Sequence, residues 1–585
     1  MMNRGLAIKY GDVAPEAKEN FVPTASESEF NTLSQLQQYN LGVHNYANPC
    51  ELYQTVLDGI AAAFPSVPEQ ANLGLWSEQI SNDDGTFTEP IVLTLTSEGQ
   101  YSSQGLTLTF DTPNGIYATK VNIKWLRITD EGIITLSEKE YNPDNAFYFC
   151  RNKVENYNKV VITFYSLNMP KNRLKLCAID YGYGTIFYGA ELRNTKIIQE
   201  IDPISTQISI NTADFVLDSK SDMEYSFQAK QPLNIYFNGV LKATTFVKSS
   251  KRKARFLWDI QSEDYIGIMN SIPYYGGMYT GADAYGLLED IFNTAKVPYK
   301  INEALRGVPI YGHIPFTTCR EALMQVAFAV QNVVDTSDRE YIEVFALDNE
   351  IKQTIPLNRI KQGQNFVDDE TVTGVEVTMH NYVIKTDSES SDWIVVYEAE
   401  QDGVGDNILV KFDQPLHSLA IRGDGLIVES GTNYAIVNAR GTDFRLAGLA
   451  YEHTTVIKRK LNPVVLASEL EKIVAIENAT LVSAHNIDDV LNKCYNWLTK
   501  TNTTNLKIVE GKHVQYGEGY KYGHHKYGTF KYGQKYPNIV TYDEPVNIGE
   551  NIKAETEYLG IVSGRIIKQS FNLNGNIIVK EAVLK

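Results

Sequence analysis

The chain has 585 residues and a formal net charge of −18, and 43% of its residues are hydrophobic and 21% are charged. This length exceeds what one hydrophobic core usually supports, and the composition is typical of globular proteins, so several folded domains are expected and wholesale disorder is excluded. A charge of this sign repels a phosphate backbone, so nucleic acid is not an expected partner.

The first third of the chain contains an ambiguous segment followed by clear strand patterns. Residues 1–75 are interpreted as an N-terminal anchoring segment with one helix over 51–64, where apolar residues recur at helical spacing. Residues 76–190 contain alternating apolar runs separated by turn residues. This pattern predicts an antiparallel, jelly-roll-like β-sandwich.

The middle of the chain predicts a first β-barrel and then a small helical insertion. Strand patterns continue over 191–269, and Asn238-Gly239 predicts a hairpin turn because both residues tolerate positive φ. Between 270 and 347 the apolar period changes from two to 3.6, which predicts a helix around 284–292. A second helix is expected after Thr318, whose spacing to Glu321 is that of a capping box. Residues 270–347 are therefore an expected α+β insertion.

The last part of the chain returns to strands. Residues 348–465 carry strand patterns that predict a second β-barrel. Residues 466–585 are predicted to contain a helix over 486–498, a Tyr-Gly-rich loop and closing strands. The expected fold class is therefore mainly β with an α+β insertion: an N-terminal β-sandwich followed by two tube-like β-barrels.

A short repeat of Lys-Tyr-Gly begins at residues 521, 526 and 531. Each unit offers an aromatic face, a cation and a flexible glycine, which suits sugar rings or a partner subunit. The alternative is a long hairpin that packs its tyrosines on a neighbour, and we favour it because tyrosine is enriched at interfaces. The candidate interaction residues are Tyr516, Tyr522, Tyr527, Tyr532, Tyr536 and, in the sandwich, Trp76.

Two tryptophans of the sandwich could form a carbohydrate-binding surface, because large aromatic faces stack on sugar rings. Tryptophans of this kind more often fill the core of a sandwich. Trp125 shares one face of its strand with Val121 and Ile123, which favours burial. The pattern leaves Trp76 open between the two roles.

Motifs for catalysis are missing from the sequence: it has no nucleophile elbow, zinc-protease helix, P-loop or dinucleotide fingerprint. Three pairs of adjacent acids could serve glycoside hydrolysis, but such pairs are more typical of turns and helix caps. We expect no enzymatic activity and no cofactor. The pairs are Asp83-Asp84, Asp368-Asp369 and Asp488-Asp489.

Cysteine and histidine also lack the spacing of a reactive or metal site. Cys319 stands at a predicted helix start, but the apolar face that follows it indicates a buried thiol. His513, His524 and His525 match no compact ligand motif, so no metal is expected. The five cysteines are scattered and odd in number, which indicates reduced thiols, with a bridge between Cys150 and Cys177 left open.

Residues 1–20 lack the apolar core of an export signal, and no run approaches the ~20 apolar residues of a membrane span. We therefore expect a chain that is made in the cytoplasm and has no membrane span. If it reaches the exterior of a cell, it does so within a particle or by lysis.

Several strings in the chain resemble the hub proteins at the tip of phage tails. They are FQAKQPLNIYFNG at 227–239, WDIQSEDYIG at 258–267, YGGMY at 275–279 and YGHIPFTTCREALMQVAFA at 311–329, followed by VVDTS from 333 and a strand over 340–345. Further similar strings are NATLVS from 478 and GRIIKQSFNLNG from 564. The resemblance covers about residues 190–585 and depends on order and spacing.

This resemblance implies two tube-like barrels interrupted by the helical insertion and packed as a homotrimer. Six similar barrels would then match a six-fold tail tube. The implied partners are further copies of the chain, the tail tube or distal tail protein, the tape measure protein and the baseplate or receptor-binding proteins. The implied location is the tail tip or baseplate of a phage or phage-tail-like particle made in the host bacterial cytoplasm.

The N-terminal 190 residues depart from the plain pattern of that family, in which the hub barrel starts near the first residue. They look similar to extensions in prophage proteins of Gram-positive bacteria of the clostridial type. A cell-surface glycan or a baseplate neighbour are both open as partners of the sandwich. The alternatives to a hub are a carbohydrate-binding adhesin or fibre and, third, an envelope-degrading enzyme.

Overall fold

The computed structural model describes residues 5–13, 17, 20–26, 75–112, 114–129, 132–219, 227–384, 393–463, 472–519, 535–542, 545–573 and 577–585. These residues are mostly strands with a few short helices, which confirms the prediction of a mainly β fold with small helical insertions. The helix expected over 51–64 lies outside the described residues. The chain forms two compact units: one combines Met1–Thr195, Ala213–Ser262 and Asp338–Glu340, and the other contains the remaining segments.

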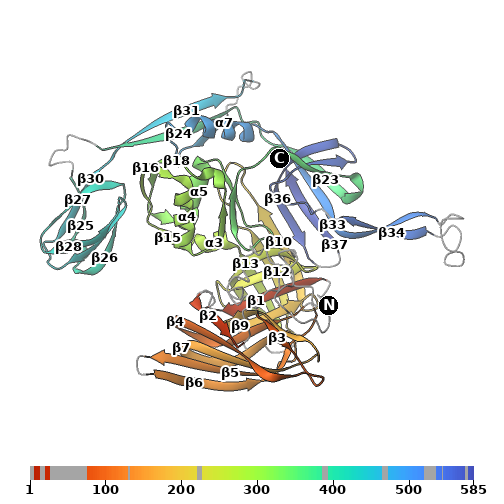
Figure 1. Cartoon of the computed structure of the whole chain (residues 1–585). Helices are drawn as coiled ribbons and strands as arrows, with labels where there is room; N and C mark the ends of the chain where they lie inside the picture. The colour runs from red at the N-terminus through yellow and green to blue at the C-terminus, as the bar shows by residue number, and fades with distance from the viewer. Residues whose placement is uncertain are drawn as a thin grey trace. The chain divides into compact units, whose positions relative to one another are not determined.

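The first unit contains two sheets (Figure 1). Its strands are β1 (Leu6–Val13), β2 (Val22–Ala25), β3 (Leu75–Ile80), β4 (Thr86–Phe110), β5 (Ala118–Thr129), β6 (Gly132–Tyr141), β7 (Phe147–Leu167), β8 (Arg173–Asp180), β9 (Gly182–Tyr188), β11 (Thr212–Asp218), β12 (Pro232–Phe237), β13 (Val240–Ala254) and β14 (Leu257–Glu263).

The segment predicted as the β-sandwich, still called the sandwich below, forms one seven-stranded sheet of β2 to β8, in the order β3-β8-β4-β7-β5-β6 with β2 on β4. Alternate residues of β5 are buried, as the sequence pattern predicts for a strand with one face on a core. Residues 91–95 and 106–110 both show strand alternation, and they belong to one 25-residue strand, β4, which pairs irregularly with β7 near Gly105. Gly105 has a φ of 145°, and a Cβ there would lie 2.2 Å from the Cys150 carbonyl oxygen, so only glycine fits this irregular point.

The other sheet of the first unit, called the β1 sheet below, has the order β11-β14-β13-β12-β1-β9. β1 pairs antiparallel with β12, from Leu6 opposite Phe237, and with β9, where Val13 lies opposite Gly182. The hairpin turn between β12 and β13 is confirmed, since Asn238 and Gly239 have φ values of 52° and 83°. The sandwich is therefore inserted between two neighbouring strands of the β1 sheet.

The second unit contains the helices α3 (Tyr265–Met269), α4 (Ala284–Ala295), α5 (Cys319–Ala329), α6 (Ala399–Asp402) and α7 (Ile487–Leu498), and the 3₁₀ turns η2 (Glu303–Leu305) and η3 (Leu357–Arg359). The predicted helices at 284–292 and 486–498 are confirmed. The capping box at the start of α5 is also confirmed: the Thr318 side chain accepts from the Glu321 amide, and the Glu321 side chain accepts from the Thr318 amide.

The strands of the second unit form several small sheets and one larger one. They are β10 (Leu192–Glu200), β15 (Pro273–Tyr274), β16 (Gly277–Asp283), β17 (Tyr299–Ile301), β18 (Pro309–Ile314), β19 (Thr317–Thr318), β20 (Val333–Asp335), β21 (Ile342–Phe345), β22 (Ile351–Ile355), β23 (Ile360–Asp368), β24 (Gly374–Val383), β25 (Trp393–Glu398), β26 (Gly405–Lys411), β27 (Leu416–Arg422), β28 (Gly425–Ser430), β29 (Tyr434–Ala439), β30 (Arg445–Ala450), β31 (Glu452–Leu461), β32 (Ile473–Ile476), β33 (Asn502–Gly519), β34 (Lys535–Tyr542), β35 (Asn551–Thr556), β36 (Gly560–Asn572) and β37 (Ile577–Leu584).

The segment predicted as the second barrel, residues 348–465, is divided among several sheets. β22 and β23 pair with strands of the C-terminal part, β35 and β33. β24 and β31 pair with each other and carry α7 on one face, while β25 to β30 form two three-stranded sheets around a core of their own. The larger sheet β23-β33-β37-β36, which also pairs with residues 196–200 of β10, thus combines segments far apart in the sequence.

Candidate functional site

The predicted interaction residues lie only partly within the described structure. Tyr522, Tyr527 and Tyr532 lie outside the described residues. The backbones of Tyr516 and Tyr536 belong to β33 and β34, which pair as the two arms of a hairpin. This pairing agrees with the interpretation of the repeat as part of a long hairpin, while the ligand of the tyrosines stays a prediction.

The two sandwich tryptophans occupy strands of the same sheet. Trp125 is fully buried in β5 and its ring lies edge-on to Tyr141 at 6.5 Å between centroids, so its predicted burial is confirmed. It is therefore inaccessible to a sugar ring. The backbone of Trp76 belongs to β3 and lies opposite Lys175 of β8.

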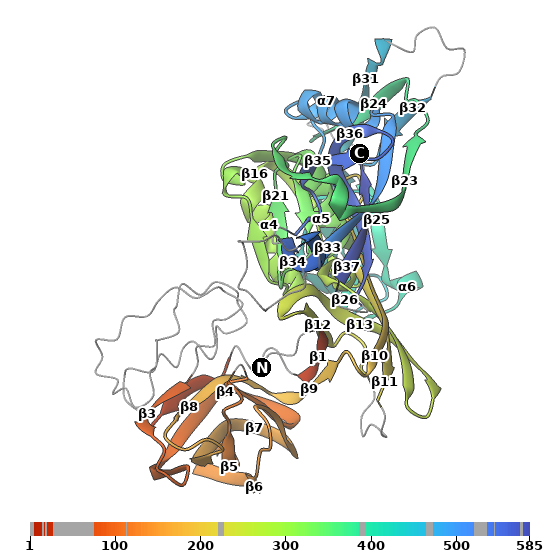
Figure 2. The same cartoon turned by 90° about the vertical axis from the view of Figure 1, so that its right-hand side faces the viewer.

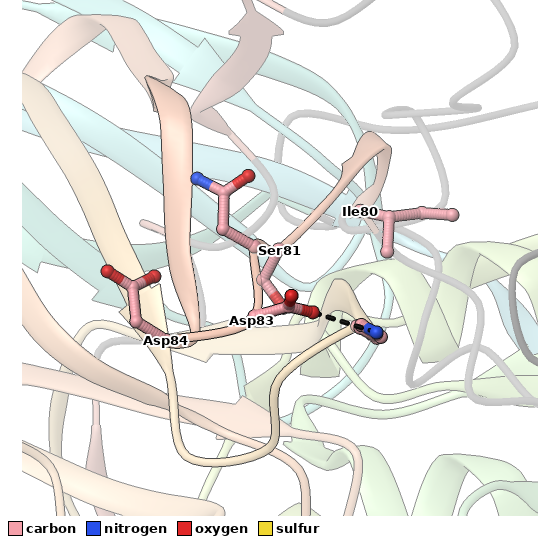
Figure 3. Close-up of a pocket in the computed structure, with 6 residues that line it drawn as sticks. Ile80, Ser81, Asp83 and Asp84 are labelled. Carbon is pink, nitrogen blue, oxygen red and sulfur yellow. Dashed lines mark ion pairs between the residues drawn. The ribbon is translucent and has the colours of Figure 1, made fainter.

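A hollow of about 570 Å³ at the edge of the sandwich is lined by Ile80, Ser81, Asn82, Asp83, Asp84 and Lys171 (Figure 3). Asp83 pairs with Lys171 at 2.8 Å, whereas the Asp84 carboxylate points away from it. Asp84 accepts hydrogen bonds from the Thr86 hydroxyl and amide, which lower the pKa of its carboxyl. Glycoside hydrolysis needs one carboxyl kept protonated, and the lowered pKa of Asp84 disfavours that role for Asp84, whose contacts to Thr86 are those of a turn.

The other two acid pairs are also engaged in structural contacts. Asp369 accepts from the Thr503 hydroxyl at 2.6 Å and pairs with Lys585 at 3.0 Å. Asp488, in the first turn of α7, pairs with Lys458 of β31 at 2.8 Å. Carboxylates near a helix start also interact favourably with the helix dipole. These contacts give both pairs a role in holding segments together.

The thiol of Cys319 is fully buried at the start of α5, and burial raises its pKa to about 11. Its neutral form is therefore dominant at pH 7, which disfavours nucleophilic chemistry. The described cysteines are all free and buried, so the bridge left open between Cys150 and Cys177 is not formed. Among the described residues, no three His, Cys, Asp or Glu side chains converge as a metal site, and no helix is long and apolar enough to cross a membrane.

A row of aromatic and imidazole rings, which the sequence pattern did not predict, lies on one face of β24 and β31. His380 of β24 approaches His453 of β31 with 3.0 Å between Nδ1 and Nε2, and Tyr382 stacks on His453 at 4.4 Å. His380 Nε2 lies 2.8 Å from the Glu477 carbonyl oxygen, so it carries the proton and donates. Nδ1 of His380 therefore accepts from His453.

A third histidine, His313 of β18, faces the same row at 5.5 Å from the Tyr382 ring. Its Nε2 lies 2.6 Å from Asn433 Oδ1, while the Asn433 amide nitrogen donates to the carbonyl oxygens of Tyr275 and Ile314. Asn433 thus joins the loop between β28 and β29 to β18. The row and Asn433 together link three sheets of the second unit.

Acidification should loosen this row. Burial lowers the pKa of His380 and of His313, and for His380 the neighbouring His453 lowers it further. The stabilisation is therefore present above the unfolded pKa of ~6.5 and is lost as the pH falls below it, because the unfolded chain then binds more protons. Faster hydrogen exchange of β24 amides at pH 5.5 than at pH 7.5, corrected for intrinsic rates, is the expected result.

His380→Asn provides the control for the pH effect, because it removes the titrating group and keeps polar atoms near Glu477. The extra exchange at pH 5.5 should then shrink, and an unchanged pH response in the His380 variant would contradict the assignment.

The buried carboxyl of Asp264 changes stability with pH in the opposite direction. Burial raises its pKa to about 6 although Thr336, Asn211 and two amides of α3 donate to it. Its contribution to stability therefore grows as the pH falls below 6, which is opposite to the loosening expected from the histidines.

Exposed apolar side chains gather at the turn between β35 and β36. Tyr558 is 83% exposed and Ile561 is 68% exposed, and Leu559 and Leu357 nearby are also exposed. Leu357 is held there by its amide, which donates to Glu555 of β35. An exposed apolar patch of this kind is typical of a surface that contacts another protein. The sequence signal was the YLGI string, which strand alternation does not explain.

No protein-family model and no curated protein matches the sequence. Among solved structures, the chain is similar to a tail protein from Neisseria meningitidis MC58 (10% identity, TM-score 0.38, covering 67% of this chain and 91% of that one). It is similar to the prophage MuSo2 43 kDa tail protein from Shewanella oneidensis (9% identity, TM-score 0.37, covering 68% and 96%) and to the prophage tail protein gp18 from Listeria monocytogenes EGD-e (8% identity, TM-score 0.35, covering 68% and 91%). At these TM-scores the likenesses establish neither a shared fold nor a shared function.

Proposed function

We propose that the chain is a structural component of a phage tail or phage-tail-like particle, and within it the hub at the tail tip or baseplate. In this role it joins the tail tube and tape measure protein to the receptor-binding parts through protein surfaces and without a chemical step. The acid pairs and Cys319 support this proposal, because each is engaged or buried in a way that fits a structural role.

The observation that carries the proposal is the pairing of β1 with β9 and β12. The resemblance to tail hubs implies a barrel that starts near the first residue, and the N-terminal 190 residues departed from that pattern. Because β1 belongs to the β1 sheet, the N-terminal residues that depart from the hub pattern are explained as an insertion. The hub-type sheet starts at Leu6, is interrupted by the sandwich and resumes at Gly182. The helical insertion follows this sheet in the chain, as the resemblance implies, whereas the second barrel stays a proposal.

The hub role requires several copies of the chain around one axis, and we propose a homotrimer. Mass photometry of the purified chain tests this directly. The expected result is a species of three times the 65.8 kDa chain mass that persists on dilution to nanomolar concentration. A monomer at every concentration reached by sedimentation would contradict self-assembly of the isolated chain.

Excision of the sandwich should leave the β1 sheet folded. Because Val13 and Gly182 are opposite each other on paired strands, replacing residues 14–181 with Asn-Gly joins β1 and β9 by a two-residue hairpin turn. Lys9 pairs with Asp180 at 3.3 Å, so the excised chain should also carry Lys9→Met to avoid leaving a cation without its partner. Retained protection of β12 amides and retained assembly are expected, and loss of both would contradict the insertion.

The carbohydrate-binding alternative keeps less support than the hub. Trp125, one of the two aromatic candidates of the sandwich, is buried. The alternative then depends on Trp76 and the tyrosine repeat. A glycan array probed with the intact chain and with the excised chain distinguishes the two roles, since a binding signal that disappears on excision would establish the sandwich as a lectin module.

A further inference from the structure

The densest positive charge of the chain lies in a hairpin of the first unit. Lys248, Lys251, Arg252, Lys253 and Arg255 fall within eight residues at the end of β13 and the turn to β14, and no other window of eight residues in the sequence holds five cations. All five side chains are exposed. The chain as a whole carries −18, so this hairpin opposes the sign of the rest of the molecule.

The end of this hairpin is a preorganised structure. Figure 2 shows the yellow-green ends of β13 and β14 extending as a ribbon. Arg252 Nε donates to the Arg255 carbonyl oxygen at 3.0 Å, and its guanidinium lies over the Trp258 ring at 5.4 Å. Lys253 pairs with Asp259 across the ribbon at 2.6 Å. The backbone of such a ribbon is already ordered before it meets a partner, so ordering it adds little to the cost of binding.

We infer that this basic hairpin is a contact surface for an acidic protein surface, and that its partner is a second copy of this chain. The inference rests on the proposed self-assembly. Copies that each carry −18 repel one another, so a place where opposite charges meet favours assembly and fixes its register. The hairpin supplies that place, because residues 248–259 contain five cations and one acid, Asp259.

Charge also favours a protein partner over nucleic acid. A phosphate backbone that approached the hairpin would meet the field of the remaining surface, which is more negative than the chain total. An acidic protein surface meets the same field but has apolar and polar groups to bury as well. Phe256 and Trp258 lie beside the cations in the hairpin and are half-buried, so aromatic surface is present next to the charge.

The test removes charge from the hairpin and compares it with the same loss elsewhere. One variant carries Lys251→Gln, Lys253→Gln and Arg255→Gln, and leaves Arg252 in place because it holds the turn. The control carries Lys120→Gln, Lys124→Gln and Lys153→Gln, three exposed lysines of the sandwich whose side chains are 45–64% exposed. Both variants change the net charge equally, so general repulsion between copies rises equally.

The expected result in mass photometry at 50 mM salt is that the hairpin variant needs at least tenfold more protein than wild type to assemble, while the control assembles as wild type does. Wild-type assembly should also weaken with salt, because the contact is between exposed charges. If wild type assembles and the hairpin variant assembles equally well, this inference is overturned and the proposed function stands. If wild type is monomeric throughout, both fail for the isolated chain. Fluorescence anisotropy with a 20-base-pair duplex completes the test: duplex binding lost in the hairpin variant, with unchanged assembly, would assign the hairpin to nucleic acid instead.

Discussion

Lys580→Met is expected to destabilise the larger sheet of the second unit by ~3–5 kcal/mol, the range for breaking a buried ion pair. Lys580 of β37 is fully buried, and its ammonium lies 3.0 Å from Glu510 of β33, whose side chain is 7% exposed. Both groups also hold Val546, since Glu510 accepts from its amide and Lys580 donates to its carbonyl oxygen. The variant leaves the Glu510 carboxylate buried without its cation.

The measurement should report on this sheet by itself, because a chain with two compact units does not unfold in one step. Hydrogen exchange of β33 and β37 amides in increasing urea gives the free energy of opening for these strands. The double variant Lys580→Met with Glu510→Gln is the control: it removes both charges and keeps an acceptor for the Val546 amide. It should recover most of the loss, and a double variant as unstable as the single one would contradict the electrostatic account.

Trp125→Ala should destabilise the sandwich by ~3–5 kcal/mol, as large-to-small changes in a core do. The indole is fully buried within the sandwich core between β5 and its neighbours. The same opening measurement, made on β5 and β7 amides, checks this value. Trp393→Ala is a suitable reference when opening is measured on the amides of its own strand, β25, because Trp393 is 37% exposed and its loss should have a much smaller effect.

Trp125→Phe separates the stability contributed by packing of the indole ring from the cost of its buried N–H group. The buried Nε1 of Trp125 has no acceptor among the described residues, so the indole nitrogen is a cost in the folded state. Phenylalanine keeps much of the ring and removes that nitrogen. We expect a loss below half that of Trp125→Ala, and equal losses would show that the indole is not the packing element described above.

Local features of the fold were predictable from the sequence because their partners are close in the chain. The capping box of Thr318 and Glu321 joins residues three apart, and the turn at Asn238-Gly239 depends on the φ values of two neighbours. The alternation of β5 likewise placed Trp125 in the core. In each case the chemistry of a few adjacent residues is sufficient to select one conformation.

Features that depend on distant pairing were not predictable. Leu6–Val13 fell within the segment interpreted as an N-terminal anchor, because nothing in these residues says that they pair with β9 and β12. The same applies to β22 and β23, which join strands more than 130 residues later in the chain. The row of rings on β24 and β31 was not predictable for a further reason. An isolated histidine such as His380 has no spacing signal in the sequence, and its partner His453 becomes evident only when the two strands are paired.

The basic hairpin was visible in the sequence but was outweighed by the total charge. Five cations within eight residues are a local signal, whereas a net charge of −18 is an average over 585 residues. An average of this kind says how copies repel at a distance, and the local density says where they can touch. A local cluster of cations can therefore contact an acidic partner although the chain as a whole is negative.

The position of this chain in a reconstruction of an intact particle tests the central proposal most directly. We predict three copies around the tail axis, in contact with the end of the tube, with the strand formed by Leu6–Val13 in the sheet that also contains β9 and β12. A chain found away from the axis, or present there as a single copy, would contradict the hub role.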